Sequence, residues 1–352
     1  MDYKKRVENL IKALMQENGS DIHLSVGRQP AFRINGELIF LANEEEFSAE
    51  DIDGFLEVLL GQEKVSKFMK EKEIDFSYSF LGETRLRGNA FFQRGQISIV
   101  MRLIPKVKTI AELGLPSILE TFARRKQGFF LVVGPVGHGK STTMSAMVNL
   151  INQERSVHVV TVEDPIEFVY PPGKSIIDQR EIGLDTDDFN IALKSVFRED
   201  VNVIMIGEMR NPETIATAVT AAETGHLVIS TLHTNNASQT IDRIIDSFPP
   251  GQQDQIRIQL AGSLIGVFSQ RLIPSITGGR VVAYELMINN NAVSNLIREK
   301  RTHEIDIVIE TGFEQGMIGM NRSLVELVQK GEITMESAYQ YSFNPKELEQ
   351  LL

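Results

Sequence analysis

The spacing of hydrophobic side chains changes near residue 104, and this change divides the chain into two predicted domains. Over residues 4–18, apolar positions recur at helical spacing until Gly19, which ends the run. Residues 22–26 then alternate apolar and polar side chains, as in a strand with one buried face. The pair Asn35-Gly36 stands between two further short apolar runs and predicts a tight hairpin.

The rest of this N-terminal part predicts helices followed by more strands. Residues 48–68 have a helical spacing that Gly61 interrupts, which favours two short helices. We therefore expect residues 1–103 to form an α+β domain around an antiparallel sheet. Its last three predicted strands are residues 76–80, 84–92 and 96–103, with turns at Gly82 and Gly95.

The second domain has a different pattern. Residues 104–110 contain a proline, lack periodicity and are interpreted as an interdomain linker. Residues 111–126 predict a helix whose main part begins past Pro116. From Gly128 onward, apolar runs alternate with helical patterns, so we expect an α/β domain, residues 111–352, with a mainly parallel sheet and a helical subdomain from about residue 290. The predicted strands are residues 129–133, 158–162, 203–206, 227–232 and 281–287.

Composition then narrows the function classes. The 352 residues are 42% hydrophobic and 24% charged, which is typical of a globular protein. The net charge of −11 disfavours attraction to nucleic acid, and the absence of cysteine excludes disulfides, thiolate zinc sites and cysteine nucleophiles. No stretch approaches about 18 consecutive apolar residues, and the N-terminus begins with a polar amphipathic run. We therefore expect a cytoplasmic protein that reaches a membrane only through a partner.

Residues 134–141 fit the phosphate-binding pattern G-x-x-x-x-G-K-[ST], between a predicted strand and a predicted helix. Backbone N–H groups of such a loop point at phosphate oxygens, and the helix N-terminus adds partial positive charge. We expect ATP and Mg²⁺, with Lys140 on the β- and γ-phosphates and Ser141 on the metal. The predicted nucleotide-binding residues are Gly134, Pro135, Val136, Gly137, His138, Gly139, Lys140, Ser141 and Thr142. His138 is expected to point outward without a chemical role.

Acidic residues follow two of the predicted strands at the end where parallel sheets bind ligands. Glu163, Asp164 and Glu167 come after residues 158–162, and Glu163 is the preferred candidate for activating water. Glu208 follows residues 203–206, and because Gly207 stands where a metal-binding Asp is usual, Glu208 is expected to contact the metal or the water.

Two histidines, His226 and His233, bracket the predicted strand 227–232. We interpret them as a polar relay near the phosphates in preference to a metal site.

With these motifs in this order, the chain resembles the retraction ATPases of type IV pili, within the secretion-ATPase superfamily. The similarity runs from Ser20-Asp21-Ile22-His23-Leu24 to the C-terminus. Residues 163–168 resemble the aspartate box of the family, residues 207–210 its Walker B segment, and residues 220–228 and 231–234 its histidine box. Residues 270–272 and 295–299 follow in the order that the family has.

The resemblance implies a RecA-like P-loop ATPase core behind a PAS-like first domain, assembled as a homohexameric ring. It implies that Arg85, Arg87 and Arg94 of the first domain reach the nucleotide of a neighbour, that Glu163 is the general base and that Glu208 organises metal and water. The catalytic set then comprises Lys140, Glu163, Glu208, Arg210, His226, His233, Arg85, Arg87 and Arg94. The implied partner is the inner-membrane platform protein of the pilus, with indirect contact to pilin, at the inner face of the cytoplasmic membrane.

Three residues depart from the pattern of the family: Val136, His138 and Ser294, the last in place of a usual arginine. Three alternatives stay open. Pilus-extension and type II secretion ATPases usually carry a longer N-terminal region and a four-cysteine zinc insertion, which this sequence lacks. A RecA-like nucleic-acid translocase would share the core, and so would a catalytically weak regulatory subunit that docks on an active motor.

Overall fold

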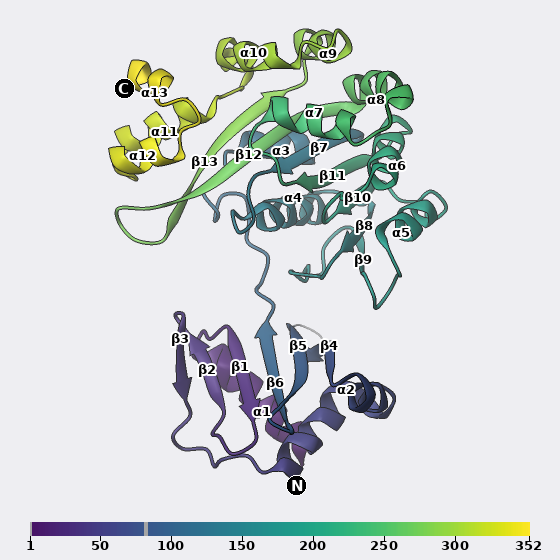
Figure 1. The fold of residues 1–352 in the computed structure, drawn as a ribbon, viewed down its shortest axis with the longest axis vertical. Helices are drawn as coiled ribbons and strands as arrows, with labels where there is room; N and C mark the ends of the chain where they lie inside the picture. The colour runs from purple at the N-terminus through teal and green to yellow at the C-terminus, as the bar shows by residue number, and fades with distance from the viewer. Residues whose placement is uncertain (1, 81–83) are drawn as a thin grey trace. The chain divides into compact units, whose positions relative to one another are not determined.

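The computed structural model describes residues 2–80 and 84–352, so the turn predicted at Gly82 lies outside the described residues. The chain forms two compact units, Met1–Lys106 and Val107–Leu352 (Figure 1). The boundary between the units lies inside the segment 104–110.

The N-terminal unit is an antiparallel sheet with two helices packed on one hydrophobic core. The strand order is β3-β2-β1-β6-β5-β4. The elements are α1 (Tyr3–Gln16), β1 (Asp21–Ser25), β2 (Ala31–Ile34), β3 (Glu37–Phe40), α2 (Ala49–Glu71), β4 (Glu73–Phe80), β5 (Thr84–Gln93) and β6 (Gln96–Leu103).

Glycines set the turns of this unit where the sequence predicts them. Asn35 and Gly36 both adopt positive φ, 51° and 89°, as a two-residue hairpin requires. Gly61 adopts φ 73° and breaks α2 into two helical pieces, as predicted. Gly95 has φ 78° in the turn between β5 and β6.

The C-terminal unit is built on a seven-stranded sheet of order β13-β12-β7-β11-β10-β8-β9. All neighbours are parallel except β13, which is antiparallel to β12, so the predicted mainly parallel α/β sheet is confirmed. The strands are β7 (Gly128–Val133), β8 (His158–Glu163), β9 (Ile176–Glu181), β10 (Val203–Ile206), β11 (Leu227–Leu232), β12 (Leu264–Pro274) and β13 (Arg280–Ile288).

Helices flank this sheet and form most of the C-terminal part of the chain. They are α3 (Ile118–Ala123), α4 (Lys140–Glu154), α5 (Phe189–Val196), α6 (Pro212–Glu223), α7 (Ala237–Asp246), α8 (Pro250–Ser263), α9 (Asn291–Arg298), α10 (Ile305–Thr311), α11 (Met320–Gln329), α12 (Met335–Tyr341) and α13 (Pro345–Leu351), with 3₁₀ turns at Thr302–Glu304 and Phe313–Gln315. The helix predicted over residues 111–126 is wrong in extent, because Gly114 at φ 64° and Pro116 confine the α-helix to Ile118–Ala123.

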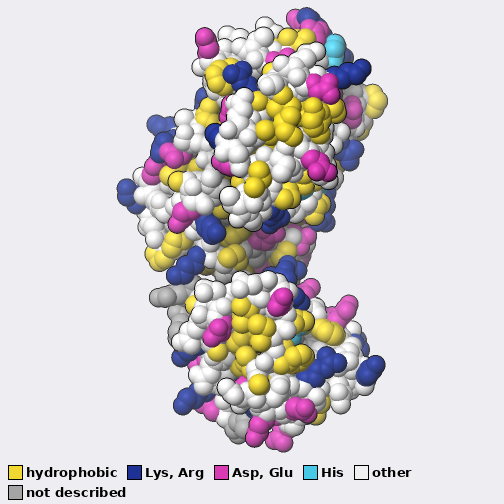
Figure 2. All heavy atoms as spheres, turned by 90° about the vertical axis from the view of Figure 1, so that its left-hand side faces the viewer, with side chains coloured by type: hydrophobic (Ala, Val, Ile, Leu, Met, Phe, Trp, Pro, Cys, Tyr) yellow, Lys and Arg dark blue, Asp and Glu magenta, His cyan; other side chains and the backbone are white. Residues whose placement is uncertain are grey.

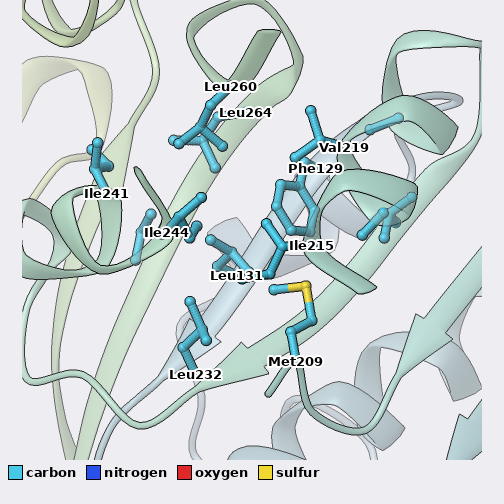
Figure 3. Close-up of a cluster of buried hydrophobic side chains, with 14 of the residues drawn as sticks. Phe129, Leu131, Met209, Ile215, Val219, Leu232, Ile241, Ile244, Leu260 and Leu264 are labelled. Carbon is cyan, nitrogen blue, oxygen red and sulfur yellow. The ribbon is translucent and has the colours of Figure 1, made fainter. Parts of the chain in front are cut away.

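The sheet is buried on both faces. Along β7, Phe129, Leu131 and Val133 belong to one apolar cluster, which α6, α7 and α8 also contribute to (Figure 3). The alternate residues Phe130 and Val132 belong to a second cluster, with α3 and α4. Burial on both faces accounts for the continuous apolar runs in these strands, and the parallel order brings the carboxyl ends of β7, β8, β10 and β11 to one edge. No helix within residues 2–80 and 84–352 is long and apolar enough to span a membrane.

Candidate active site

The glycine-rich loop lies between the end of β7 and the start of α4, as the sequence predicts. Gly134, Gly137 and Gly139 have φ of 146°, 77° and 80°, a range that side chains rarely adopt. A Cβ atom on Gly134 would also lie 2.6 Å from the carbonyl oxygen of Gln270. The loop therefore requires glycine at Gly134 both for its backbone angle and for its close approach to β12.

Lys140 is buried at the base of this loop and folds back on it. Its Nζ atom donates to the carbonyl oxygens of Gly134 and Pro135, at 2.9 Å each, and lies 3.3 Å from Nδ1 of His233. Burial lowers the pKa of the Lys140 ammonium to about 8, because the charged form loses its hydration. An anionic phosphate in the loop would offset that loss.

A cavity of about 420 Å³ opens beside the loop, within the size range of small-molecule sites. The loop forms one side of it, and the residues that follow β8, β10 and β11 form another. Of the predicted site residues, the cavity brings together Val136, Gly137, Gly139, Lys140, Ser141, Thr142, Glu163, Glu208 and His233.

Glu163 is the buried acid of this cavity, with an exposed fraction of 6%. Its Oε1 atom accepts hydrogen bonds from the Thr161 hydroxyl, at 2.7 Å, and from Nε2 of Gln179, at 3.1 Å. Burial raises the pKa of the carboxyl group, and the two hydrogen bonds oppose that shift. A held carboxylate of raised pKa is suited to accept a proton from water near neutral pH.

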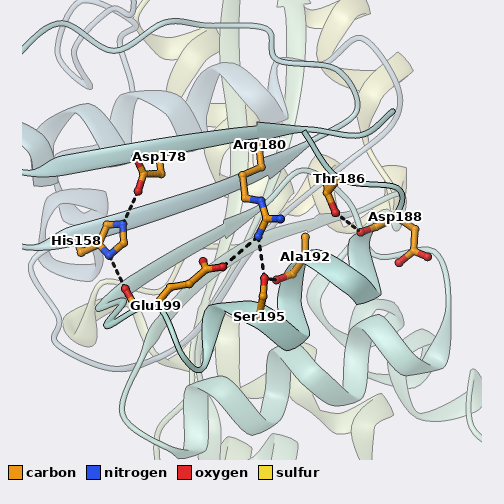
Figure 4. Close-up of polar contacts among 8 residues, drawn as sticks. All are labelled: His158, Asp178, Arg180, Thr186, Asp188, Ala192, Ser195 and Glu199. Atoms are coloured by element: carbon orange, nitrogen blue, oxygen red, sulfur yellow. Dashed lines mark hydrogen bonds and ion pairs between the residues drawn. The ribbon is translucent and has the colours of Figure 1, made fainter. Parts of the chain in front are cut away.

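Strand β9, which carries Gln179, is fastened beside β8 by polar contacts at the sheet edge (Figure 4). The His158 ring contacts Asp178 through Nε2 and the Glu199 carbonyl oxygen through Nδ1, at 2.9 Å each. Arg180 donates to the Ser195 hydroxyl of α5 at 2.8 Å. These contacts hold Gln179 at a fixed position next to Glu163.

Glu208 lies between the Arg210 guanidinium and the His233 imidazole. Its Oε1 atom contacts Nη2 of Arg210, and its Oε2 atom lies 3.5 Å from Nε2 of His233. Because Nδ1 of His233 faces Lys140, a polar chain runs from Arg210 through Glu208 and His233 to the loop. At Gly207, a Cβ atom would lie 3.3 Å from the carbonyl oxygen of Val162, which leaves little room for the usual acid there.

Ser141 and Glu208 supply a hydroxyl and a carboxylate oxygen to one cavity. Hard oxygen donors of this kind suit Mg²⁺, which takes the remainder of its shell from phosphates and water. Across the described residues, no group of three or more His, Asp or Glu side chains is placed to hold a metal without a nucleotide.

The expected site residue His226 lies away from this cavity. His226 directly precedes β11, at the opposite end of the strand from His233. Its Nδ1 atom lies 2.9 Å from the Ala221 carbonyl oxygen, and its ring packs edge-on against Phe197. A relay that includes both histidines is therefore wrong within one chain, because a parallel strand separates them.

The predicted arginines belong to the N-terminal unit. Arg85 and Arg87 share one face of β5, as their spacing predicts, opposite the buried side chain of Leu86. Arg94 lies in the turn after β5, about 30 Å along the strand from Arg85 at the usual rise per residue. Arg94 therefore lies at the other end of β5 from Arg85 and Arg87, and the expectation that all three reach the nucleotide of a neighbour stays a prediction.

His138 does not point outward, which corrects a second expectation. Its Nδ1 atom accepts a hydrogen bond of 2.9 Å from the backbone N–H of Leu272, on β12. The buried Gln270, two residues before Leu272 on β12, donates through Nε2 to the His138 carbonyl oxygen at 2.5 Å. The Oε1 atom of Gln270 accepts from the Thr143 hydroxyl of α4 at 2.7 Å. Gln270 belongs to the family segment at residues 270–272, but the sequence alone does not show that this side chain holds the phosphate loop.

Arg271 and Glu285 are two further buried polar residues that sequence reasoning did not assign. The Arg271 guanidinium donates to the Asn235 Oδ1 atom at 2.9 Å and lies over the Phe343 ring, 5.0 Å from its centre. Glu285 on β13 accepts from the Ala237 N–H at 2.8 Å, and burial raises the pKa of its carboxyl group to about 7. Both residues hold the chain that follows β11 against β12 and β13.

A glycine-rich loop with a buried lysine, beside acids at the carboxyl ends of parallel strands, defines the nucleotide-hydrolysing P-loop enzymes. Residues 3–339 match the family described as type II/IV secretion system protein, and the chain belongs to this family. It is an ATPase of that family, as its full-length similarity to retraction ATPases of type IV pili bears out.

Several relatives match over nearly their whole length. The type IV pilus retraction ATPase PilT of Pseudomonas aeruginosa is 41% identical over 94% of this chain and 96% of its own. The twitching motility protein of Neisseria gonorrhoeae is 43% identical over 91% and 86%. The crystal structure of the pilus retraction motor PilT with bound ADP superposes with a TM-score of 0.89, at 43% identity, over 98% of this chain and 99% of that one.

The buried lysine leads to a prediction on pH. In the free protein the pKa of Lys140 is about 8, whereas a bound phosphate favours the charged amine. The affinity for nucleotide should therefore be highest below pH 8, where Lys140 is charged. It should fall as the pH rises above 8, by up to about tenfold per pH unit. Titration with a fluorescent ADP analogue between about pH 7.5 and 9.5 measures this slope, over a range in which the phosphates of ADP stay ionised.

The matched control is Lys140→Arg, because a guanidinium stays charged over this range. This variant should bind less tightly but with a flat profile. The interpretation fails if the two proteins show the same slope.

Proposed function

We propose that this protein is a motor ATPase that powers the retraction of a type IV pilus, and hence twitching motility. The observation that carries the proposal is similarity of 41% and 43% identity over nearly the whole chain to proteins named for retraction and twitching. It is supported by the complete set of a lysine, a hydroxyl and two acids around the 420 Å³ cavity.

The hydrolysis step follows from the positions of the side chains. Lys140 exchanges its two carbonyl acceptors for the β- and γ-phosphates of ATP, and the loop N–H groups hold the same oxygens. Ser141 and Glu208 would hold Mg²⁺, which neutralises phosphate charge when it is bound. Glu163 accepts the proton of the attacking water, and His233 fixes the orientation of Glu208.

The ring is the second part of the proposal. A nucleotide site that a neighbour completes requires a closed head-to-tail ring, here a homohexamer. One face of β5 carries the half-buried Arg85 and the exposed Arg87, and these are the residues we assign to the nucleotide of a neighbouring subunit. Arg94 would serve a separate contact, because it lies at the far end of β5.

The third part concerns the partner, which we take to be the inner-membrane platform protein of the pilus, with contact to pilin only through it. The protein would then act in the cytoplasm, peripheral to the membrane. Helix α9 supports this role, because Asn295 and Arg298 are exposed on it and the exposed Glu299 directly follows it. Ser294 instead lies against α8, with its hydroxyl 3.0 Å from the Ala261 carbonyl oxygen. The replacement of an arginine by Ser294 therefore leaves the exposed residues of this motif in place.

Extension and secretion ATPases are the alternative, and their similarity to this chain is lower in identity or in the share of this chain that it covers. The type IV pilus assembly ATPase TfpB of Acinetobacter baylyi is 30% identical, but the match spans only 46% of it. The match to a type II secretion protein E of Xanthomonas campestris spans 30% of that protein. A type IV pilus ATPase other than the retraction motor is a second alternative, because the type IV pilus ATPase PilU of Pseudomonas aeruginosa is 36% identical over 97% of this chain.

Replacement of the proposed base should separate binding from hydrolysis. Glu163→Gln keeps the Oε1 acceptor for Thr161 and Gln179 but cannot accept a proton. Hydrolysis should fall by at least about a hundredfold, with ADP affinity within about twofold of the wild type. Phosphate release and ADP titration measure the two quantities. Glu167→Gln, an exposed acid of the same cavity, is the control and should stay active. Normal turnover by Glu163→Gln would remove this residue from the mechanism.

A shared site predicts complementation between inactive subunits. Lys140→Ala subunits and Arg85→Ala/Arg87→Ala subunits should each be inactive, and mixed rings should regain part of the activity at interfaces that combine an intact Lys140 with intact arginines. Mass measurement with nucleotide should give a hexamer. A fully active monomer would refute the shared site.

Direction requires a genetic test, since ATP hydrolysis in a ring can drive a platform either way. Cells that lack the protein should keep surface pili, in equal or greater number, and fail to twitch. Cells without pili would mean extension. Unchanged twitching with weak ATPase activity in vitro would favour the regulatory alternative.

A further inference from the structure

His138 stands out because it belongs to the phosphate loop and contacts no part of the cavity that the loop forms. Its side chain is half-buried against β12 and is engaged there through Nδ1. Of the nearby loop residues, Val136 is exposed to solvent, and the Lys140 side chain points toward the expected position of the phosphates. The role of the His138 imidazole therefore lies in its contact with strand β12.

The N–H group that His138 accepts from has lost its strand partner. Pairing between β7 and β12 ends at Val133 and Ser269, because β7 leaves the sheet to form the loop. On its other edge β12 continues beside β13, with Leu272 opposite Val282. The N–H of Leu272 faces the loop edge, where a buried donor without an acceptor is costly. His138 Nδ1 takes the place of the missing strand.

The contact is one of three hydrogen bonds between the phosphate loop with its helix and this strand. Gln270 bridges the other two, accepting from the Thr143 hydroxyl and donating to the His138 carbonyl oxygen. The backbone of Gly139 also packs against this strand, since a Cβ atom there would lie 3.2 Å from Gln270 Nε2 and 3.4 Å from Leu272 Cδ1. The N–H groups that must face the phosphates are thus held in place from behind by β12.

Only a neutral imidazole can make this bond, since Nδ1 must be unprotonated to accept. The charged groups around it are all cations: Lys140 on α4, Arg271 on β12 and Arg280 on β13. Burial and these cations lower the pKa of His138, so the ring is neutral at physiological pH and the bond is made. Acid breaks it, since an added proton occupies Nδ1 and is repelled by the three neighbours.

We propose that His138 is a positioning residue of the ATPase, whose neutral imidazole fastens the phosphate loop to β12, so that protonation of the ring releases the loop and weakens nucleotide binding. The proposal rests on the nucleotide-binding role of the loop and adds to it an acid limit that belongs to one side chain.

The test compares ADP affinity of three proteins between about pH 8 and pH 5. In His138→Asn, the Oδ1 atom lies one bond beyond Cγ, as Nδ1 does in histidine, and it accepts at every pH. In His138→Ala the acceptor is gone. At pH 8, His138→Asn should bind within about twofold of the wild type and His138→Ala about three- to tenfold more weakly, the usual range for one hydrogen bond.

The pH profile separates a positioning role from general stability. ADP phosphates themselves protonate below pH 7, so the ratio of wild-type to His138→Asn affinity is the readout. This ratio should fall about three- to tenfold toward pH 5, and the ratio of His138→Ala to His138→Asn should stay constant. An NMR titration of the His138 ring, assigned by its absence from the variants, should give the same midpoint. Thermal unfolding at both pH values checks that all three proteins remain folded.

Two outcomes would overturn the proposal: an affinity ratio that does not change with pH, or His138→Ala that binds like the wild type at pH 8. Lys140→Ala distinguishes a failure of the site itself. If the wild type binds ADP no better than Lys140→Ala, the nucleotide site is wrong. If it binds better and the His138 variants do not differ, only the assignment of His138 is wrong.

Discussion

Strand β7 pairs with β12 only as far as Val133 and Ser269, and the phosphate loop occupies the space where that pairing ends. On the edge that faces the loop, backbone groups of β12 beyond this point have no strand partner and must find partners outside the sheet. The loop provides one through the side-chain acceptor at His138, and its backbone packs closely against Gln270 at Gly134. The conformation of the loop is therefore determined as much by the strand behind it as by its own glycines.

Burial shifts the pKa values of the two main ionisable groups of the site in opposite directions, and both shifts favour the neutral form. It lowers the pKa of Lys140 and raises that of Glu163, so both groups are shifted toward their neutral forms. A triphosphate changes the balance for Lys140 alone, because its anionic oxygens lie in the loop. Glu163 keeps its own hydrogen bonds from Thr161 and Gln179, which hold the carboxylate ready to take a proton. The different pKa shifts thus match the different roles of a phosphate ligand and a base.

The sequence predicted what local patterns encode. The loop, the strands β7, β8, β10 and β11, and the placement of Glu163 and Glu208 at their ends all follow from apolar runs and a spaced motif. Strand β12 was missed because it follows α8 without a turn residue between them, and β9 was missed because it is a half-exposed edge strand with polar side chains. The contacts of Gln270, Arg271 and His138 depend on β12, so a local reading could not place them. His226 was misjudged for a related reason, since a motif gives order along the chain but not the end of the strand at which a residue lies.

The same strand connects the nucleotide cavity to the helices that follow it. Behind His233, the chain at Asn235 is held by the Ser269 hydroxyl and by Arg271, both on β12. The Arg271 guanidinium also lies over the ring of Phe343, a residue of the segment between α12 and α13. A shift of His233 as the phosphates change would therefore reach the C-terminal helices through two partly buried hydrogen bonds and one cation–π contact, with no need for a flexible linker. Because packed strands move as units and resist gradual deformation, this arrangement suits a motor that converts a change at the phosphates into a discrete displacement.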